Sequence, residues 1–197
     1  MKALFFELKT SLLLTAVLVV LLCGAYPLAV WAGAQALFPA RANGSLIVDR
    51  NGAVRGSALL AQNFSSDGNF QPRASAAGTG YDATNSSGTN LGPTSQKLSD
   101  SIKAAVAAYR TANGLADDAP VPADAVTSSA SGLDPHISTA NAAIQAQRVA
   151  RARHLPLAAV QAVVAAHTED RDFGVLGEPR VNVLLLNLAL DEIPSGK

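Results

Sequence analysis

Five side chains in the second half of the chain have types that could bind a metal ion or transfer protons. They are Ser131, Asp134, His136, His167 and Glu169. Imidazoles and carboxylates are ligands that zinc accepts, and the same groups act as general acids and bases. Their spacing matches neither the His-Glu-x-x-His pattern of zinc proteases nor the Gly-x-Ser-x-Gly nucleophile elbow. We therefore interpret Asp134-Pro135 as a turn in which Asp134 hydrogen-bonds nearby backbone, and a membrane-tethered extracytoplasmic metal-dependent hydrolase is the alternative function.

Three further motifs have a simple structural interpretation. The segment 86–92 contains glycines but lacks the lysine and the spacing of a phosphate-binding P-loop. Segment 177–180, Gly-Glu-Pro-Arg, is typical of a turn into a strand. A solvent-exposed helix face is the expected place of three arginines, Arg148, Arg151 and Arg153. We predict no catalytic residue and no metal site among these motifs.

The composition excludes one class of partner and separates the chain into two parts. The formal net charge is zero, so the basic surface expected of a nucleic-acid-binding protein is absent. Charged residues make up 15% of the chain, against roughly 25% in soluble domains. No charged residue or histidine occurs from Thr10 to Ala40, and the single cysteine, Cys23, lies in this apolar part. The remainder therefore has no thiol that could act as a nucleophile or metal ligand.

The apolar segment 12–38 is long enough to span a membrane. As a helix rising 1.5 Å per residue it would extend about 40 Å, more than the roughly 30 Å of a hydrocarbon core. A cleaved signal peptide is the alternative, but its apolar region is usually about 7 to 15 residues. We predict a retained transmembrane helix, kinked at Pro27. Four small residues in its second half would allow close packing against a partner helix: Gly24, Ala29, Gly33 and Ala36.

The expected topology places a short cytoplasmic N-terminus at 1–11 and a soluble α/β (α+β) domain at 42–197. Lys2, Lys9 and the amino terminus give a small positive bias to the first side of the span. The large domain is then extracytoplasmic.

The soluble domain combines strands and helices. Strands are predicted at 45–48 and 53–61, because Asn51-Gly52 between them is a strong hairpin turn signal. Residues 63–95 are expected to form a long loop. Apolar spacing predicts helices at 98–113, 139–154 and 157–167, with Ser138 as the cap of the second. The nearly continuous apolar run 181–190 is interpreted as a strand buried on both faces.

Several segments, in order along nearly the whole chain, resemble the C subunit family of bacterial Kdp potassium-transporting P-type ATPases. They are 42–47 (ANGSLI), 56–64 (GSALLAQNF), 73–76 (RASA), 81–82 (YD), 88–94 (GTNLGPT), 126–137 (VTSSASGLDPHI), 148–150 (RVA) and 177–183 (GEPRVNV). Ala74 and Thr139 stand where the family commonly has proline.

The resemblance implies a non-catalytic accessory subunit in the membrane of an ATP-driven potassium uptake complex. Its partners would be a potassium-channel-like subunit, the ATP-hydrolysing P-type subunit and a small single-helix subunit, with ATP and potassium handled by the complex. The family has been proposed to raise the ATP affinity of the hydrolysing subunit as a catalytic chaperone, through a nucleotide-binding glutamine that matches Gln145. The expected topology separates Gln145 from cytoplasmic ATP, so direct contact with ATP is not expected.

Overall fold

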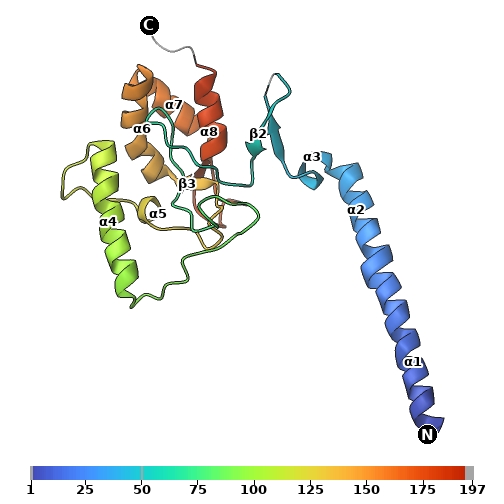
Figure 1. Ribbon diagram of the computed structural model, residues 1–197. Coiled ribbons are helices and arrows are strands. Elements are labelled where there is room, and N and C mark those ends of the chain that lie inside the picture. The colour runs from blue at the N-terminus through green and yellow to red at the C-terminus, as the bar shows by residue number, and fades with distance from the viewer. Residues whose placement is uncertain (1, 50, 194–197) are drawn as a thin grey trace. The chain divides into compact units, whose positions relative to one another are not determined.

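The structure is a computed structural model that describes residues 2–49 and 51–193. The chain divides into two units, Met1–Leu46 and Ile47–Lys197, and each is described by itself. Figure 1 shows the helical first unit in blue and the mixed second unit in teal to red.

The first unit is almost entirely helical. It consists of α1 (Lys2–Val19), the π-helix η1 (Val20–Ala25), α2 (Tyr26–Leu37) and the short α3 (Pro39–Ala42). Segment Lys2–Leu37 is long and apolar enough to cross a membrane, and its apolar window has no buried residue. It is therefore a candidate membrane span, in agreement with the apolar pattern of the sequence.

A π-helix precedes Pro27, and the predicted kink at this proline stays a prediction. Proline has no backbone N–H and its ring crowds the preceding turn, which a regular α-helix does not accommodate. In the structure Tyr26 N–H reaches back to the carbonyl of Leu21, five residues earlier. Such wide turns occur where a helix adapts to a local disturbance, and Pro27 in the first turn of α2 supplies one.

The second unit opens with the predicted hairpin. Strands β1 (Leu46–Val48) and β2 (Val54–Ser57) form a two-stranded sheet. Asp49 closes the turn, because its Oδ1 accepts hydrogen bonds from the N–H groups of Asn51 and Ala53, both at 2.9 Å. The second strand ends earlier than predicted, since the chain turns after Ser57, whose Oγ accepts from Leu59 N–H at 3.1 Å.

A three-stranded antiparallel sheet lies deeper in the domain. Its strands are β3 (His136–Ser138), β4 (Thr168–Glu169) and β5 (Arg180–Asn182), in the order β3-β5-β4. In the central strand β5, Val181 pairs with Ile137 of β3 on one side and with Thr168 of β4 on the other. The strand β5 thus brings together Ile137 and Thr168, which are more than thirty positions apart in the sequence.

Helices surround this sheet. They are α4 (Gln96–Asn113), α5 (Ala123–Val126), α6 (Thr139–Arg153), α7 (Leu157–Ala166) and α8 (Val183–Asp191). Three of the long helices agree with the predicted ranges within a few residues. Ser138 caps α6 as predicted, because its Oγ accepts from Asn141 N–H at 3.0 Å. Gly114 ends α4 in the left-handed conformation that glycine adopts without strain.

The predicted final strand at 181–190 is wrong for most of its length. Only the first two of these residues are in β5, and α8 begins at Val183. Asn182 starts the helix, because its Oδ1 accepts from Leu185 N–H at 3.2 Å. The leucines and alanine that follow favour a helix. A continuous apolar run alone does not distinguish a buried strand from a buried helix.

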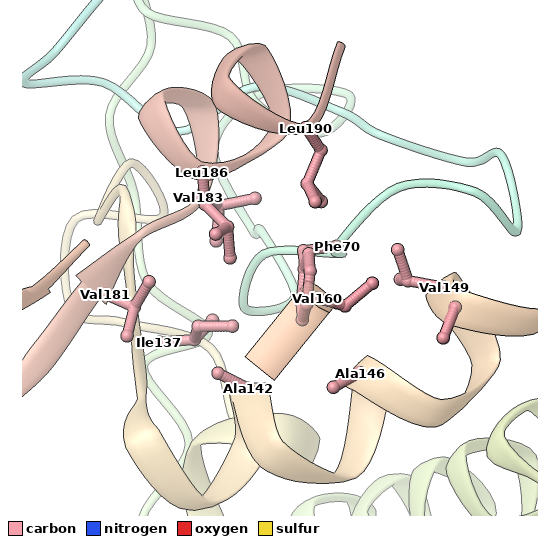
Figure 2. Packing of buried hydrophobic residues seen from close by; sticks show 11 residues of the cluster. Phe70, Ile137, Ala142, Ala146, Val149, Val160, Val181, Val183, Leu186 and Leu190 are labelled. Carbon is pink, nitrogen blue, oxygen red and sulfur yellow. The ribbon is translucent and has the colours of Figure 1, made fainter. Parts of the chain in front are cut away.

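The hydrophobic core lies between α6, α7, α8 and the three-stranded sheet. Figure 2 shows side chains from these elements pointing toward one another around Phe70, which comes from the long loop. Phe70, Val149, Val160 and Leu186 have no exposed surface. Fully burying side chains of this size stabilises a fold by about 1.5–3 kcal/mol each, so the loop that carries Phe70 is part of the core.

That loop runs from Ala58 to Ser95 without any helix or strand. Figure 1 shows it as the teal and green trace that winds from β2 to α4. The predicted long loop at 63–95 is therefore confirmed. Side chains from the helices hold this loop in place.

Candidate functional site

Three of the five candidate side chains for metal or acid–base chemistry meet beside the three-stranded sheet, with His136 on β3 and Glu169 on β4, the two strands that flank β5. His136 Nδ1 lies 3.3 Å from Asp134 Oδ1, and His136 Nε2 lies 3.9 Å from Glu169 Oε2. Arg73 Nη1 contacts the other oxygen of Asp134 at 3.1 Å, and Arg180 Nε contacts Glu169 at 3.1 Å. Each carboxylate is thus placed between the histidine and an arginine. This arrangement is a chain of polar contacts that ties the loop, β3, β4 and β5 together.

The other two candidates lie apart from this chain. Ser131 Oγ accepts a hydrogen bond from Leu133 N–H at 3.1 Å, which makes it part of a turn. His167 follows α7, and its Nδ1 lies 2.9 Å from the carbonyl oxygen of Val163. In the part of the chain that the structure describes, no group of three or more His, Cys, Asp or Glu side chains is arranged to hold a metal ion. Nothing in the site supports the hydrolase alternative.

The turn interpretation of Asp134 is confirmed. Its Oδ1 accepts a hydrogen bond from His136 N–H at 3.0 Å, two residues further along the chain. The hydrogen bond from the His136 side chain lowers the pKa of Asp134 to about 2, with smaller contributions from His136 N–H and from the Arg73 guanidinium against the opposing effect of burial. Asp134 is therefore an ionised structural anchor, unsuited to accept a proton near neutral pH.

Gln145 lies on α6 and is 2% exposed. Its Nε2 donates to the carbonyl of Gln71 at 3.0 Å and to Asn141 Oδ1 at 2.9 Å. Its Oε1 accepts from Gln71 N–H at 2.7 Å and from Arg148 Nη2 at 2.9 Å. A glutamine amide has two donor hydrogens and two acceptor lone pairs, so every hydrogen-bonding position is occupied within the fold. Gln145 fixes the long loop onto α6, and its nucleotide-binding role stays a prediction.

The prediction that Arg148 faces solvent is wrong. Arg148 is 6% exposed, and its guanidinium donates to four oxygen atoms. They are Asn113 Oδ1 at 3.1 Å, Gln145 Oε1 at 2.9 Å and the carbonyls of Asp67 at 2.5 Å and Asn69 at 3.0 Å. Burial lowers the pKa of Arg148. Arg148 therefore joins α4, α6 and the loop.

The two neighbouring arginines on α6 differ from Arg148. Arg151 is exposed, as predicted, and its guanidinium donates to the carbonyl of Gln147 within its own helix. Arg153 is partly buried, because its guanidinium donates to the carbonyl of Gly68 and pairs with Asp191 at 2.8 Å. Residues 148 and 151, three positions apart, are neighbours on the helix surface, yet Arg148 is buried and Arg151 is exposed, so the three arginines do not share one environment.

A carboxylate that the sequence analysis did not single out organises the start of α6. Asp124 Oδ2 accepts from Ser138 N–H at 2.8 Å and from Asn141 Nδ2 at 2.9 Å, and Asp124 Oδ1 accepts from Ser138 Oγ at 2.8 Å. Asn141 Oδ1 in turn accepts from Tyr109 Oη at 2.8 Å. In the sequence, Asp124 lies in an Ala- and Pro-rich linker that gives no sign of this network. The sequence signal that could have indicated it is Asn141, a polar residue at an inward-facing position of the helix.

A surface hollow of the second unit lies elsewhere. It has a volume of about 620 Å³ and is lined by the hairpin and by α8, including Ile47, Asp49, Leu185, Leu188 and Asp191. The candidate acid–base residues do not line it. This hollow and the candidate acid–base residues are therefore separate features of the second unit.

The geometry of the site does not identify a family, and comparison with known proteins does. The family profile described as "K+-transporting ATPase, c chain" (KdpC) matches residues 8–192. The potassium-transporting ATPase KdpC subunit of Rhodospirillum rubrum is 56% identical over 185 residues, which cover 94% of this chain and 95% of that protein.

This chain belongs to the KdpC family. The KdpC subunit of Myxococcus xanthus is 56% identical over 187 residues, which cover 94% of this chain and 88% of that protein. The KdpC subunit of Nitratidesulfovibrio vulgaris is 51% identical over 191 residues, covering 96% and 95%. The resemblance stated from the sequence motifs is confirmed.

The motifs that carried the KdpC resemblance converge in space. Ser75 Oγ donates to the carbonyl of Gly132 at 2.6 Å and accepts from Tyr81 N–H at 2.8 Å. Tyr81 Oη donates to the carbonyl of Arg73 at 2.9 Å, and Ser87 N–H donates to the carbonyl of Ser131 at 3.0 Å. The motif residues thus hold the long loop against the segment before β3, and the segment 86–92 is part of this packing.

The small residues of the KdpC span are open to a neighbour. A Cβ atom added at Gly24 or Gly33 would meet nothing within 4 Å. Gly24 lies in η1, while Ala29, Gly33 and Ala36 lie in α2. Their packing against a partner helix stays a prediction.

Proposed function

We propose that this chain is a non-catalytic accessory subunit of an ATP-driven potassium uptake complex. The observation that carries the proposal is the 56% identity, over 94% of the chain, to the potassium-transporting ATPase KdpC subunit of Rhodospirillum rubrum. In this proposal the chain has no cofactor of its own. Its partners are the potassium-channel-like subunit, the P-type ATPase subunit and the small single-helix subunit, which handle potassium and ATP.

The candidate span supports a place in the membrane for this subunit. Lys2–Leu37 would cross the bacterial cytoplasmic (inner) membrane with its N-terminus in the cytoplasm, and the second unit would be extracytoplasmic. A reporter enzyme that is active only in the cytoplasm, fused to the C-terminus, should then be inactive. Activity of that fusion would contradict the orientation.

The contribution of Gln145 in this proposal is indirect. Direct contact with a nucleotide would require its amide to give up hydrogen bonds to Gln71, Asn141 or Arg148. Each bond left unmade in the buried interior would cost about 1–3 kcal/mol. We therefore propose that Gln145 affects the ATP affinity of the complex by holding the shape of the accessory domain. Crosslinking of an ATP analogue to Gln145 in intact cells would contradict this.

Purification from native membranes tests the function. The chain carrying a C-terminal tag is extracted in mild detergent from cells grown at limiting potassium, and the co-purifying chains are identified. Recovery of a P-type ATPase chain together with potassium-stimulated ATP hydrolysis would support the proposal. A lone, inactive chain would contradict it.

A further inference from the structure

The connection between β4 and β5 forms a small hairpin with an apolar tip. The backbone groups of Asp172 and Leu176 exchange two hydrogen bonds of 2.9 Å. Between them, Phe173 is 93% exposed and Val175 is 72% exposed, and Leu176 itself is 58% exposed. Single exposed apolar side chains are ordinary, whereas a contiguous group of large ones marks an interaction surface. We call residues 173–176 the apolar tip.

The apolar tip is held in a demanding conformation. Phe173 has a φ of 54°, in the left-handed region that a bulky L-residue rarely adopts. Gly174 follows with a φ of 75°. Such strain persists only where the surrounding structure imposes it, and it clusters at functional sites. Phe173 is thus both exposed and strained, and it contributes little to the stability of its own domain.

Ion pairs connect the two arms at the base of the hairpin. Arg180 contacts Glu169 at 3.1 Å and Asp172 at 3.4 Å, and Arg171 contacts Glu178. These contacts join the arm that continues from β4 to the arm that leads into β5. A preorganised loop loses less conformational entropy on binding, which favours affinity.

The charge around the apolar tip restricts what it can bind. Residues 169–180 carry four carboxylates and two guanidinium groups, which leaves a formal charge of −2. The anionic surface of a membrane repels such a base, and two copies meeting at this tip would repel each other. A protein pocket with an apolar floor and basic residues at its rim is complementary to it. Aromatic side chains are frequent anchors in such pockets.

We propose that the apolar tip, with Phe173 as its anchor, docks into an apolar pocket with a basic rim on another subunit of the transport complex. This inference rests on the proposed function, and it names the surface of the second unit that makes the contact.

Cysteine labelling tests the contact in the full chain. Cys23 is first replaced by serine, and Phe173→Cys is compared with Leu59→Cys, whose native side chain is 62% exposed and lies outside the tip. Both are reacted with a membrane-impermeant maleimide, in the purified chain and in the purified complex. Assembly should slow the labelling of Phe173→Cys by at least about tenfold, because anchors lie in desolvated pockets, and leave Leu59→Cys unchanged.

A second variant keeps the test informative if cysteine itself prevents assembly. Phe173→Asn removes the ring while asparagine tolerates the left-handed conformation, so the chain should fold as well as the parent. Its recovery with the other subunits should fall, whereas Leu59→Asn should be recovered as the parent is.

Four results would overturn the inference. Equal labelling of Phe173→Cys in chain and complex would exclude the contact. Protection of the lone chain in vesicles of anionic lipid would identify the membrane as the binding surface, and a disulfide-linked pair of chains would identify a second copy. If the unmodified chain recovers no ATPase subunit, the proposed function itself fails.

Discussion

The side chain of Asn187 on α8 brackets the backbone of Phe70, which is 117 residues earlier in the chain. Its Oδ1 accepts from Phe70 N–H at 2.8 Å and its Nδ2 donates to the carbonyl of Phe70 at 2.9 Å. Both residues are buried. The amide replaces a β-bridge and satisfies the two polar backbone groups that accompany the phenyl ring into the core.

Replacing Asn187 with alanine should therefore destabilise the domain strongly. Two buried backbone groups would lose their partners, at about 1–3 kcal/mol each. Urea unfolding of the full chain in detergent, followed by circular dichroism, should show a loss of about 2–5 kcal/mol. Asn63→Ala, an exposed asparagine of the same loop, should change the free energy of unfolding by no more than about 0.5 kcal/mol. Equal losses for both variants would contradict this account.

Arg148→Met should be far more damaging than Arg151→Met on the same helix. The first change leaves acceptors on Asn113, Asp67 and Asn69 without their donor, which we expect to cost at least about 3 kcal/mol. Arg151 is exposed, and its guanidinium hydrogen-bonds the carbonyl of Gln147 in its own helix. Limited proteolysis should cut the Arg148→Met chain in segment 58–95 while the Arg151→Met chain resists like the parent. Equal resistance of the two variants to proteolysis would show that the hydrogen bonds of Arg148 are not needed to hold the loop.

The hydrogen bonds of Asp134 with His136 and its ion pair with Arg73 predict a loss of stability in acid. The pKa of Asp134 is about 2 in the folded protein, below the ordinary value of 3.8, so the stabilisation is present above about pH 4 and is lost as the pH falls toward 2. Partial exposure screens the effect, and we expect roughly 1–2 kcal/mol. The free energy of unfolding of the parent should fall more steeply between pH 5 and pH 2, a window set by these two pKa values, than that of Asp134→Asn. If the free energies of unfolding of the parent and of Asp134→Asn change in parallel with pH, the stabilising role of ionised Asp134 is excluded.

Gly132→Ala should destabilise the junction of loop and sheet. Gly132 has a φ of +68°, and an added Cβ would lie 2.6 Å from the carbonyl oxygen of Ser87 and 2.7 Å from the backbone nitrogen of Ala77. Backbone must shift to admit it, at a cost of about 2–4 kcal/mol. At Gly92 an added Cβ has free space and φ is not left-handed. Gly132→Ala should therefore lower the melting temperature more than Gly92→Ala does. A common melting temperature would argue against the close approach.

In the span, Gly33→Leu should weaken assembly, because a large side chain prevents close approach of a neighbouring helix. We expect a cost of about 1–2 kcal/mol, near the value of one interhelical contact. The measured quantity is the fraction of chain recovered with other subunits in mild detergent. Ala16→Leu, in the first half of the span and outside the small-residue set, is the control. Unchanged recovery of Gly33→Leu would show that this face does not pack.

The elements with a local signal could be predicted from the sequence. Asn51-Gly52 specifies a turn, and the structure has the hairpin there. Ser138 supplies a cap oxygen, and α6 begins at the next residue. These predictions succeed because the deciding interaction lies within a few residues of the chain.

The predictions that failed concern features that depend on distant parts of the chain. A run of leucines fits a strand or a helix equally well until tertiary packing decides. Arg148 is buried because three oxygen atoms from other segments surround its guanidinium, and its neighbours in sequence do not indicate that. The pairing of Asp134 with Arg73 and the approach of Glu169 to His136 likewise require the folded sheet.

The long loop between β2 and α4 also sets the order of folding events. Gln71 is fixed by a residue 74 positions later, and Phe70 by one 117 positions later. During synthesis the loop precedes both α6 and α8, so its set of partners is complete only after α8 has emerged. Contacts of such sequence separation slow folding. The newly made domain should thus pass through a protease-sensitive stage that ends abruptly when α8 docks.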